Sequence, residues 1–283
     1  MKFGCHLSIK EGYIGAAKRA EAINASAFQY FSKNPKSLSL KQFDRNDTET
    51  CKLFCEKNNL LSVAHSPYPT SLTPSNNEKR KQIIHSLLND LEIAEACGSI
   101  GVVVHFGKRL QSLSTLQSYK LIIDMLNDVL SKWEGKGKLI LENNAGFPGA
   151  FGTTLEELTQ IRKLCDYPEK VGFCFDTCHA FSCGLWDGEN WSQLFLKGVE
   201  LDYFEHLEVV HFNNSNYATR SGKDRHALIF GAGYIKENQF DQIVKTPQLN
   251  DIPFILETPK EEVSHAKEIM LLQKRWGKHL KNN

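Results

Sequence analysis

The sequence lacks any long apolar run, any excess of charge of one sign and any recognisable export signal. None of its 283 residues begins a stretch of eighteen apolar residues, and no charged segment leads into a short apolar one. We therefore expect a soluble, intracellular protein with no membrane partner. The 34 basic and 33 acidic residues leave a net charge of +1, which excludes a broad basic coat but allows a local basic face for nucleic acid.

Paired cysteine motifs are also missing, although the chain has eight cysteines. A Cys₄ zinc module usually needs two Cys-x-x-Cys pairs, so a thiolate zinc site is disfavoured. Without an export signal, reduced thiols are the expectation. Cys51 and Cys55 stand four residues apart on an expected helix, where two side chains can meet. We expect two free thiols there, with a disulfide as the alternative.

Short β-rich apolar runs recur eight times, and helical periodicity separates them. The runs begin at residues 3, 27, 60, 100, 137, 171, 207 and 252, and clear helical stretches cover 76–97, 115–132 and 261–276. Eight strand–helix units in this length predict an α/β fold, a closed (β/α)₈ TIM barrel, with a doubly wound open sheet as the alternative. No Pro/Gly/Ser linker divides the sequence, so we expect a single domain, residues 1–283.

Six of the expected strands end in the same way: an apolar residue, any residue, and then His, Asp or Glu. Side chains at i and i+2 share one face of a strand. If the first of the three lies inside the barrel, the third lies one layer higher, at the carboxyl-terminal mouth where barrel active sites lie. These third residues are His65, His105, Glu142, Asp176, His211 and Glu257. One such residue is usually structural, but six predict a metal cluster, because several buried carboxylates are costly without cations.

Three further candidates lie just beyond strand ends. His179 follows Asp176 by three residues, and Asp224 and His226 form an Asp-x-His in the loop after the seventh strand. Taken alone, that loop pair would be ordinary surface, but nine candidates are too many for one metal and indicate two or three. Imidazole and carboxylate without thiolate suit Zn²⁺, Mn²⁺ or Fe²⁺. His6 ends the first strand and points toward the mouth. A structural role for His6 and a role in binding at the mouth are equally supported.

Four segments of the sequence resemble the endonuclease IV family of zinc-dependent apurinic/apyrimidinic (AP) endonucleases. The most specific is GFCFDTCHAF at 172–181, followed by HFNNSNYATRSGKDRH at 211–226, HSPY at 65–68 and LENNAG at 141–146. The resemblance runs from GCHLS at 4–8 to LET at 256–258, nearly the whole chain. It implies a (β/α)₈ barrel with three metal ions at its mouth, usually zinc, with Mn²⁺ or Fe²⁺ at some positions.

The resemblance also implies how the nine candidates are shared among the metals. One zinc would lie on His65, His105 and Glu142, a second on Glu142, Asp176, His211 and Glu257, and a third on His179, Asp224 and His226. Glu142 would bridge two ions, and Glu257 would orient the attacking water as well as bind metal. These two glutamates are therefore the expected catalytic residues.

The implied substrate is duplex DNA that has lost a base. The implied reaction hydrolyses the phosphodiester 5′ to the abasic site and leaves a 3′-hydroxyl and a 5′-deoxyribose phosphate, with 3′-phosphatase and 3′-phosphodiesterase activity beside it. We expect a monomer working in base excision repair. The expected DNA contacts are Tyr68, Lys33, Asn34, Lys36, Arg225 and His6; Tyr68 would stack or insert, and solvated surface is the alternative for each.

Two loops depart from the pattern of the family. Pro69-Thr70-Ser71 stands where two aliphatic residues and an asparagine are usual, and Gly231-Ala232-Gly233 stands where Gly-Glu-Gly is usual. We expect the chemistry to be retained and the grip on DNA to be altered. A sugar isomerase or epimerase on a similar barrel is the alternative enzyme, but it has no need of His179 or the Asp224/His226 pair. A catalytically inactive damage-binding module is disfavoured by the complete ligand set.

Overall fold

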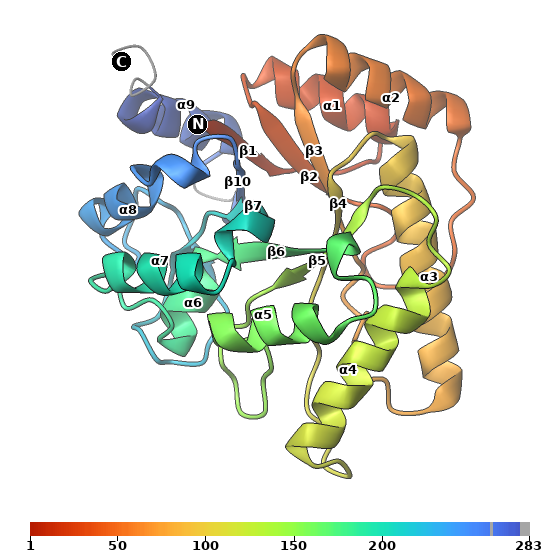
Figure 1. Cartoon of the computed structure of the whole chain (residues 1–283). Helices are drawn as coiled ribbons and strands as arrows, with labels where there is room; N and C mark the ends of the chain where they lie inside the picture. The colour runs from red at the N-terminus through yellow and green to blue at the C-terminus, as the bar shows by residue number, and fades with distance from the viewer. Residues whose placement is uncertain (261–262, 278–283) are drawn as a thin grey trace.

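Eight parallel strands close into a barrel in the computed structural model, which describes residues 1–260 and 263–277. Their order is β1-β10-β7-β6-β5-β4-β3-β2, so each strand pairs with its neighbours along the chain and β10 closes on β1. The predicted TIM barrel is confirmed, and the open-sheet alternative is wrong (Figure 1). The barrel strands are β1 (Lys2–His6), β2 (Ala27–Phe31), β3 (Leu61–His65), β4 (Gly101–Val104), β5 (Lys138–Glu142), β6 (Val171–Asp176), β7 (Leu207–His211) and β10 (Pro253–Leu256).

Helices surround these strands on the outside (Figure 1). They are α1 (Gly12–Ala22), α2 (Arg45–Lys57), α3 (Asn77–Ala96), α4 (Thr115–Leu130), α5 (Leu155–Leu164), α6 (Thr177–Cys183), α7 (Trp191–Glu200), α8 (Glu237–Val244) and α9 (His265–Trp276). Three short 3₁₀ turns, η1 (Pro168–Lys170), η2 (Phe204–His206) and η3 (Pro247–Leu249), lead toward β6, β7 and β10. A small antiparallel pair, β8 (Asn214–Ser215) and β9 (His226–Ala227), folds the long loop after β7 over the barrel mouth.

Polar side chains fix where several of these helices begin. The side chain of Asn76 accepts a hydrogen bond from the amide of Lys79 at the start of α3, and Ser114 with Gln117 forms a capping box at the start of α4. Both helices match their predicted ranges to within two residues. The third predicted range, 261–276, begins too early, because Ser264 caps α9; its residues 261–262 lie outside the described part of the chain.

The barrel interior is filled by one layer of small and branched side chains, called here the interior ring: Ala27, Val63, Val103, Ile140, Cys174, Val209 and Ile255. Six of the seven are the apolar residues that the strand-end pattern placed inside the barrel. A larger apolar core lies between the strands and the helices. Side chains two positions after the interior ring must therefore point into the mouth, because the strand pleat repeats every two residues.

Gly4 fixes how closely β1 and β2 approach. It lies opposite Ala27, and a Cβ on it would fall 2.0 Å from the carbonyl oxygen of Ala27. No other residue fits there, so β1 contributes no side chain to the interior ring. The same register places His6 level with Gln29, and both side chains lie at the mouth.

All eight cysteines are free thiols, Cys51 and Cys55 among them. Within the described residues, no helix combines the length and apolarity needed to cross a bilayer.

Candidate metal centre

Six side chains from six strands meet at the carboxyl-terminal mouth and are called here the mouth ring: His65, His105, Glu142, Asp176, His211 and Glu257. Four of them are the last residues of their strands, and His105 and Glu257 come one residue after β4 and β10. A cavity of about 460 Å³ opens onto the ring and is also lined by His6, Tyr68, His179 and the loop of Asp224 to His226. The structure thus brings all nine predicted ligands to one place.

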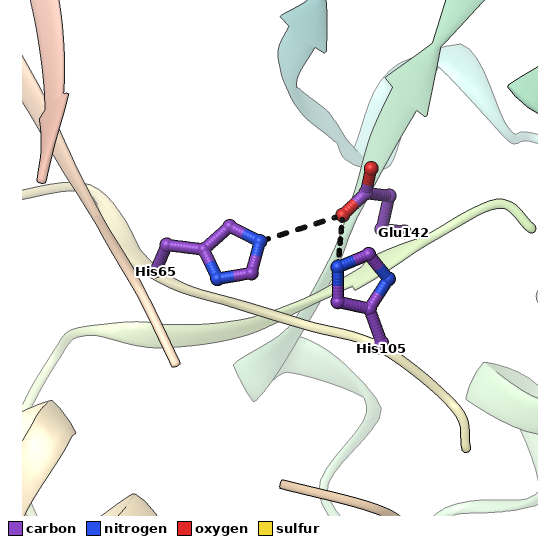
Figure 2. A group of neighbouring side chains, drawn as sticks. All are labelled: His65, His105 and Glu142. Atoms are coloured by element: carbon purple, nitrogen blue, oxygen red, sulfur yellow. Dashed lines mark ion pairs between the residues drawn. The ribbon is translucent and has the colours of Figure 1, made fainter. Parts of the chain in front are cut away.

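Glu142 lies at the centre of the ring, with its side chain 1% exposed. Its Oε2 is 3.4 Å from Nε2 of His105 and 3.7 Å from Nε2 of His65, and both rings point at this one oxygen (Figure 2). Its Oε1 is 3.0 Å from Nδ1 of His211 and 3.2 Å from Nδ1 of His179. One carboxylate therefore faces four imidazoles, two on each oxygen.

Two of the three predicted ligand sets form compact groups. Each residue of a set offers one donor atom, and these atoms all lie within 4.8 Å of one another. The first set is His65, His105 and Glu142, and the second is Glu142, Asp176, His211 and Glu257. Glu142 belongs to both sets, which is the arrangement that a bridging carboxylate requires.

The third predicted set, His179, Asp224 and His226, is looser. Asp224 Oδ2 is 3.3 Å from His179 Nε2, and its Oδ1 is 3.4 Å from His226 Nε2. The compact group is instead formed by His179 and His226 with Asp176. Asp176 also caps the start of α6, because its Oδ1 accepts a hydrogen bond from the amide of His179 at 2.7 Å. The side chain of Asp224 is 55% exposed, at the open side of the cavity.

Charge compensation inside the ring shows in the pKa values of its acids. Burial alone would raise the pKa of Glu142, but His105 and His211 outweigh it and hold the pKa well below its ordinary value. Glu257 follows the same pattern, because His211 and His6 oppose its burial and lower its pKa. The pKa of Asp224 is lowered too, where His179 opposes the effect of burial. All three carboxylates are therefore ionised at neutral pH.

The histidines divide into two kinds. Burial favours the neutral ring of His179, yet Asp176 and Asp224 outweigh it and raise its pKa well above the ordinary value. The pKa of His211 is raised in the same way against burial, by Cys174, Glu257 and Glu142. Burial dominates at His105 and lowers its pKa. Without metal, protonated imidazoles thus supply the positive charge that the buried acids need.

The donor chemistry of the site fits divalent metal ions. Among the described residues, Glu142 Oε2 and His226 Nε2 are buried atoms without a hydrogen-bond partner, and both face the ring. Unsatisfied buried atoms of this kind are rare in folded proteins and call for a missing partner such as an ion. Imidazole and carboxylate donors suit Zn²⁺, Mn²⁺ or Fe²⁺. The residues present therefore fit the metals that the motifs implied.

Two buried amides that the sequence analysis missed hold the ring in place. Gln29 bonds His211 Nε2 at 2.8 Å and Glu257 Oε1 at 2.7 Å. Asn213 donates to Asp176 Oδ2 at 2.8 Å and accepts from the amide of Glu257 at 2.8 Å. A signal for Gln29 was available, since it stands two residues after Ala27 and so repeats the strand-end pattern with an amide as its third residue.

The residues expected to touch DNA take different positions. Tyr68 is 65% exposed at the edge of the cavity, where its ring packs edge-on against Phe31 with centroids 5.0 Å apart. Asn34 and Lys36 are exposed in the loop after β2, and Arg225 is exposed beside the cavity. His6 lines the cavity and is half-buried.

Lys33 does not lie where a DNA contact was expected, and this part of the prediction is corrected. Its ammonium group is buried, 2.8 Å from Asp90 Oδ1, and donates to the carbonyl of Ser86 at 2.7 Å. Burial raises the pKa of Asp90 to about 6 and lowers that of Lys33, against the attraction between the two groups. The sequence could not reveal this, because a lysine beside exposed Asn34 gives no sign that α3 offers it a buried partner.

The far end of the same loop is also fastened to α3. The side chain of Asn89 accepts from the amide of Lys41 at 2.8 Å and donates to its carbonyl at 3.1 Å. Between Lys33 and Lys41, the carbonyl of Pro35 accepts from the amide of Tyr68 at 2.8 Å. The loop thus has two anchors on one helix and a third contact with the neighbouring loop.

Two cysteines lie within reach of the ring. Cys174 groups with Glu142 and His211, and Cys178 groups with Asp224 and His226. Burial raises the pKa of each thiol to about 12, so both are protonated at neutral pH. A thiolate is the form that binds metal, and the protonated state of these thiols agrees with the expectation that a thiolate zinc site is disfavoured. That expectation stays a prediction.

A parallel barrel with this ring of ligands at its mouth has known relatives. The chain matches the family described as Xylose isomerase-like TIM barrel over residues 17–278. Probable endonuclease 4 of Symbiobacterium thermophilum is 37% identical over 270 residues, which cover 95% of this chain and 97% of the relative. Probable endonuclease 4 of Alkaliphilus oremlandii is 34% identical over 280 residues, covering 98% of each.

Solved structures agree with the sequence relatives. Endonuclease IV from Thermus thermophilus superimposes with a TM-score of 0.85 at 29% identity, covering 98% of both chains. A D-tagatose 3-epimerase-like protein reaches a TM-score of 0.70 at 21% identity, over 97% of this chain and 96% of that one, which is a likeness of fold alone. The chain belongs to the endonuclease IV family, as its motifs predicted, and it is a nuclease of the hydrolase class.

Proposed function

We propose that this chain is a metal-dependent AP endonuclease of base excision repair that acts on duplex DNA. It would hydrolyse the phosphodiester 5′ to an abasic site and leave a 3′-hydroxyl and a 5′-deoxyribose phosphate. The observation that carries the proposal is the mouth ring together with His179, Asp224 and His226: nine donors gathered at the barrel mouth, seven of which line one cavity. We further propose that residues 1–283 act as one domain and as a monomer.

The nine donors would hold three ions, with zinc as the first choice. His65, His105 and Glu142 would take one, and Glu142 with Asp176, His211 and Glu257 would take the second; these are the two compact groups. His179, Asp224 and His226 would take the third, and exposed Asp224 would close onto it from the open side. Such ions supply Lewis-acid chemistry and lower the pKa of bound water from about 15.7 to about 7.

Glu257 is the residue best placed to guide the attacking water. Its Oε1 is held by Gln29, while the carboxylate edge lines the cavity and its Oε2 faces His211 Nδ1 at 3.3 Å. Its lowered pKa keeps it ionised, so it can accept a hydrogen bond from water and orient the oxygen toward phosphorus. The new bond joins that oxygen to phosphorus while one O–H bond of the water breaks. The bond from phosphorus to the 3′-oxygen breaks in turn, and the 3′-oxygen takes up a proton to leave as the 3′-hydroxyl.

Other residues would position the DNA around the cavity. Arg225 is exposed at its edge and can pair with a phosphate, as can Lys36 from the neighbouring loop. Tyr68 presents an exposed ring against Phe31, where it can stack in the gap that a lost base leaves. An abasic sugar extruded from a kinked duplex would then enter the cavity, and recognition would depend on shape rather than base edges.

The same arrangement supports removal of blocking groups from a DNA 3′ end. A 3′-phosphate or 3′-phosphoglycolate joins phosphorus to the same 3′-oxygen, so the atoms that move are those of the incision reaction. We therefore propose 3′-phosphatase and 3′-phosphodiesterase activities as well.

The isomerase or epimerase alternative is not favoured. Likeness to an epimerase-like protein is limited to the fold, and a site with one or two metal ions would not need His179, Asp224 and His226 as ligands. A binding module without catalysis would have no need for a carboxylate that joins two ligand sets.

A labelled duplex with one tetrahydrofuran abasic analogue tests the proposal. We expect metal-loaded protein to cut it 5′ to the analogue without added magnesium, and a strong chelator to stop the reaction. The intact duplex of the same sequence is the control and should stay uncut. Protein that carries its metals yet leaves the analogue uncut would overturn the proposed activity, and turnover of an aldose would favour the alternative.

A further inference from the structure

Gln29 is a fully buried neutral side chain among charged ones. It stands on β2 one layer above Ala27 of the interior ring, at the height of the metal ligands. Three polar side chains surround its amide: His211 from β7, Glu257 after β10 and His6 from β1. Both polar atoms of the Gln29 amide are already engaged by these three side chains. Its position calls for a role other than coordination.

The contact with Glu257 fixes which way the amide points. An ionised carboxylate can only accept hydrogen bonds, so the Gln29 atom 2.7 Å from Glu257 Oε1 must be the nitrogen. The opposite orientation would set two acceptors against each other. The amide oxygen must therefore face Nε2 of His211, at 2.8 Å. The second N–H of the amide is directed at Nδ1 of His6, at 3.1 Å.

This orientation decides where the proton of His211 lies. An amide oxygen only accepts, so Nε2 of His211 must carry hydrogen, and Nδ1 is left as the nitrogen with a free lone pair once the ring is neutral. Nδ1 is the atom that faces the acids: Glu142 Oε1 at 3.0 Å, Glu257 Oε2 at 3.3 Å and Asp176 Oδ2 at 3.9 Å. Gln29 therefore holds the tautomer that presents the correct nitrogen to these groups.

The same amide also selects an oxygen of Glu257. Its N–H holds Oε1, which leaves Oε2 directed toward His211 Nδ1 and the second ligand set. We infer that Gln29 is a positioning residue for the second metal: it fixes His211 as an Nδ1 ligand and Glu257 as a ligand through Oε2 alone, without binding metal itself. Hydrogen bonds of this kind behind a ligand orient it and tune its affinity. The inference deepens the proposed function but concerns metal binding, so it does not depend on the DNA substrate.

Zinc affinity of Gln29→Met provides the first test. Methionine has a similar length and volume but makes none of the three hydrogen bonds. We expect chelator competition to show one zinc held about ten- to a hundredfold more weakly than in the unchanged protein, with the other ions retained. Gln242→Met is the matched control, because its side chain bonds the Gly188 carbonyl and should leave zinc binding unchanged. Unchanged affinity for every ion in Gln29→Met would overturn the inference.

A second test needs no substitution and so does not depend on whether a variant folds. Long-range ¹H–¹⁵N spectra of the zinc-loaded protein report which nitrogen of each histidine bears hydrogen. We expect hydrogen on Nε2 of His211 and metal on Nδ1; metal on Nε2 would refute the inference.

Activity separates this inference from the proposed function. Incision by Gln29→Met should be low at limiting zinc and return to within a few-fold of normal at saturating zinc, because the residue acts through metal binding. A rate that stays low at saturating zinc, with all ions bound, would overturn the positioning role. If the unchanged protein binds its metals with the predicted tautomer but cuts no abasic DNA, the proposed function fails and the inference about Gln29 stands.

Discussion

The interior ring and the mouth ring are carried by the same strands, two residues apart, yet their chemistry is opposite. Below lie apolar side chains such as Val63 and Ile140, and above them lie His65 and Glu142. All four are almost fully excluded from water, so burial alone does not distinguish the two members of each pair. What differs is the partner: apolar side chains pack against each other, whereas each charged one faces an opposite charge. One step of the strand pleat separates the layer that stabilises the barrel from the layer that we propose performs the chemistry.

The largest effect is expected in the mouth ring, from Glu142→Gln. The change removes the charge that both compact ligand sets share. Substitution of residues that only hydrogen-bond to metal ligands already lowers metal affinity or activity ten- to a hundredfold. We expect incision of abasic DNA to fall by more than about a hundredfold, with zinc lost on elemental analysis. Glu208→Gln is the control, since that side chain pairs with Lys138 away from the ring. A near-normal rate would remove Glu142 from its bridging role.

One layer lower, Ile140→Ala should act on stability instead. Removing this fully buried side chain leaves a cavity inside the barrel, and we expect the free energy of unfolding to fall by about 2–5 kcal/mol. Denaturant titration measures the loss. Zinc content and the incision rate at low temperature should stay normal. If metal were lost while stability held, the two layers would not be separable.

His265 sharpens the comparison, because it lines the cavity outside the mouth ring. Burial lowers its pKa from 6.5 to about 4, opposite in direction to His179 and His211. The unfolded chain then binds more protons than the folded one between these values, so stability falls as pH drops from 6.5 to 4, by up to about 3 kcal/mol.

His265→Gln tests this pH dependence. Glutamine can still donate a hydrogen bond to the carbonyl of Thr258, which Nε2 of His265 approaches at 3.0 Å, but it does not titrate. Urea melts at pH 7 and pH 4.5 should show a smaller acid loss for the variant than for the unchanged protein. Equal losses would mean that another group dominates in this window.

The smallest effect is expected from Cys174→Ala, where the thiol of an interior-ring residue lies close to two residues of the mouth ring. Its thiol groups with Glu142 and His211 but is protonated, so we expect a loss of about 1 kcal/mol in unfolding free energy. Zinc content and metal affinity should be unchanged. Weaker zinc binding would instead make Cys174 a ligand and contradict the separation between the layers.

The strand-end pattern predicted most of this arrangement from sequence. It placed Val63 below His65 and Ile140 below Glu142, because the pleat allows only one relation between residues two apart. The pattern did not include Gln29, although Ala27 stands in the same relation to it, because its third position was defined by charged residues and histidine alone. The family resemblance, in turn, placed Lys33 among the DNA contacts, because its partner on α3 lies more than fifty residues away in the sequence and no local pattern indicates such a contact.

The buried Lys33 also affects the thermodynamics of binding. The ion pair with Asp90 and the two hydrogen bonds of Asn89 to Lys41 hold residues 34–40 at both ends. Ordering a free loop costs roughly 1–2 kcal/mol per residue in backbone conformational entropy, and a binding loop that is mobile beforehand loses that freedom when its partner arrives. Here the loss occurs when the protein folds. If Asn34 and Lys36 contact DNA as proposed, their backbone would have little conformational entropy left to lose on binding, and most of the deformation would take place in the DNA.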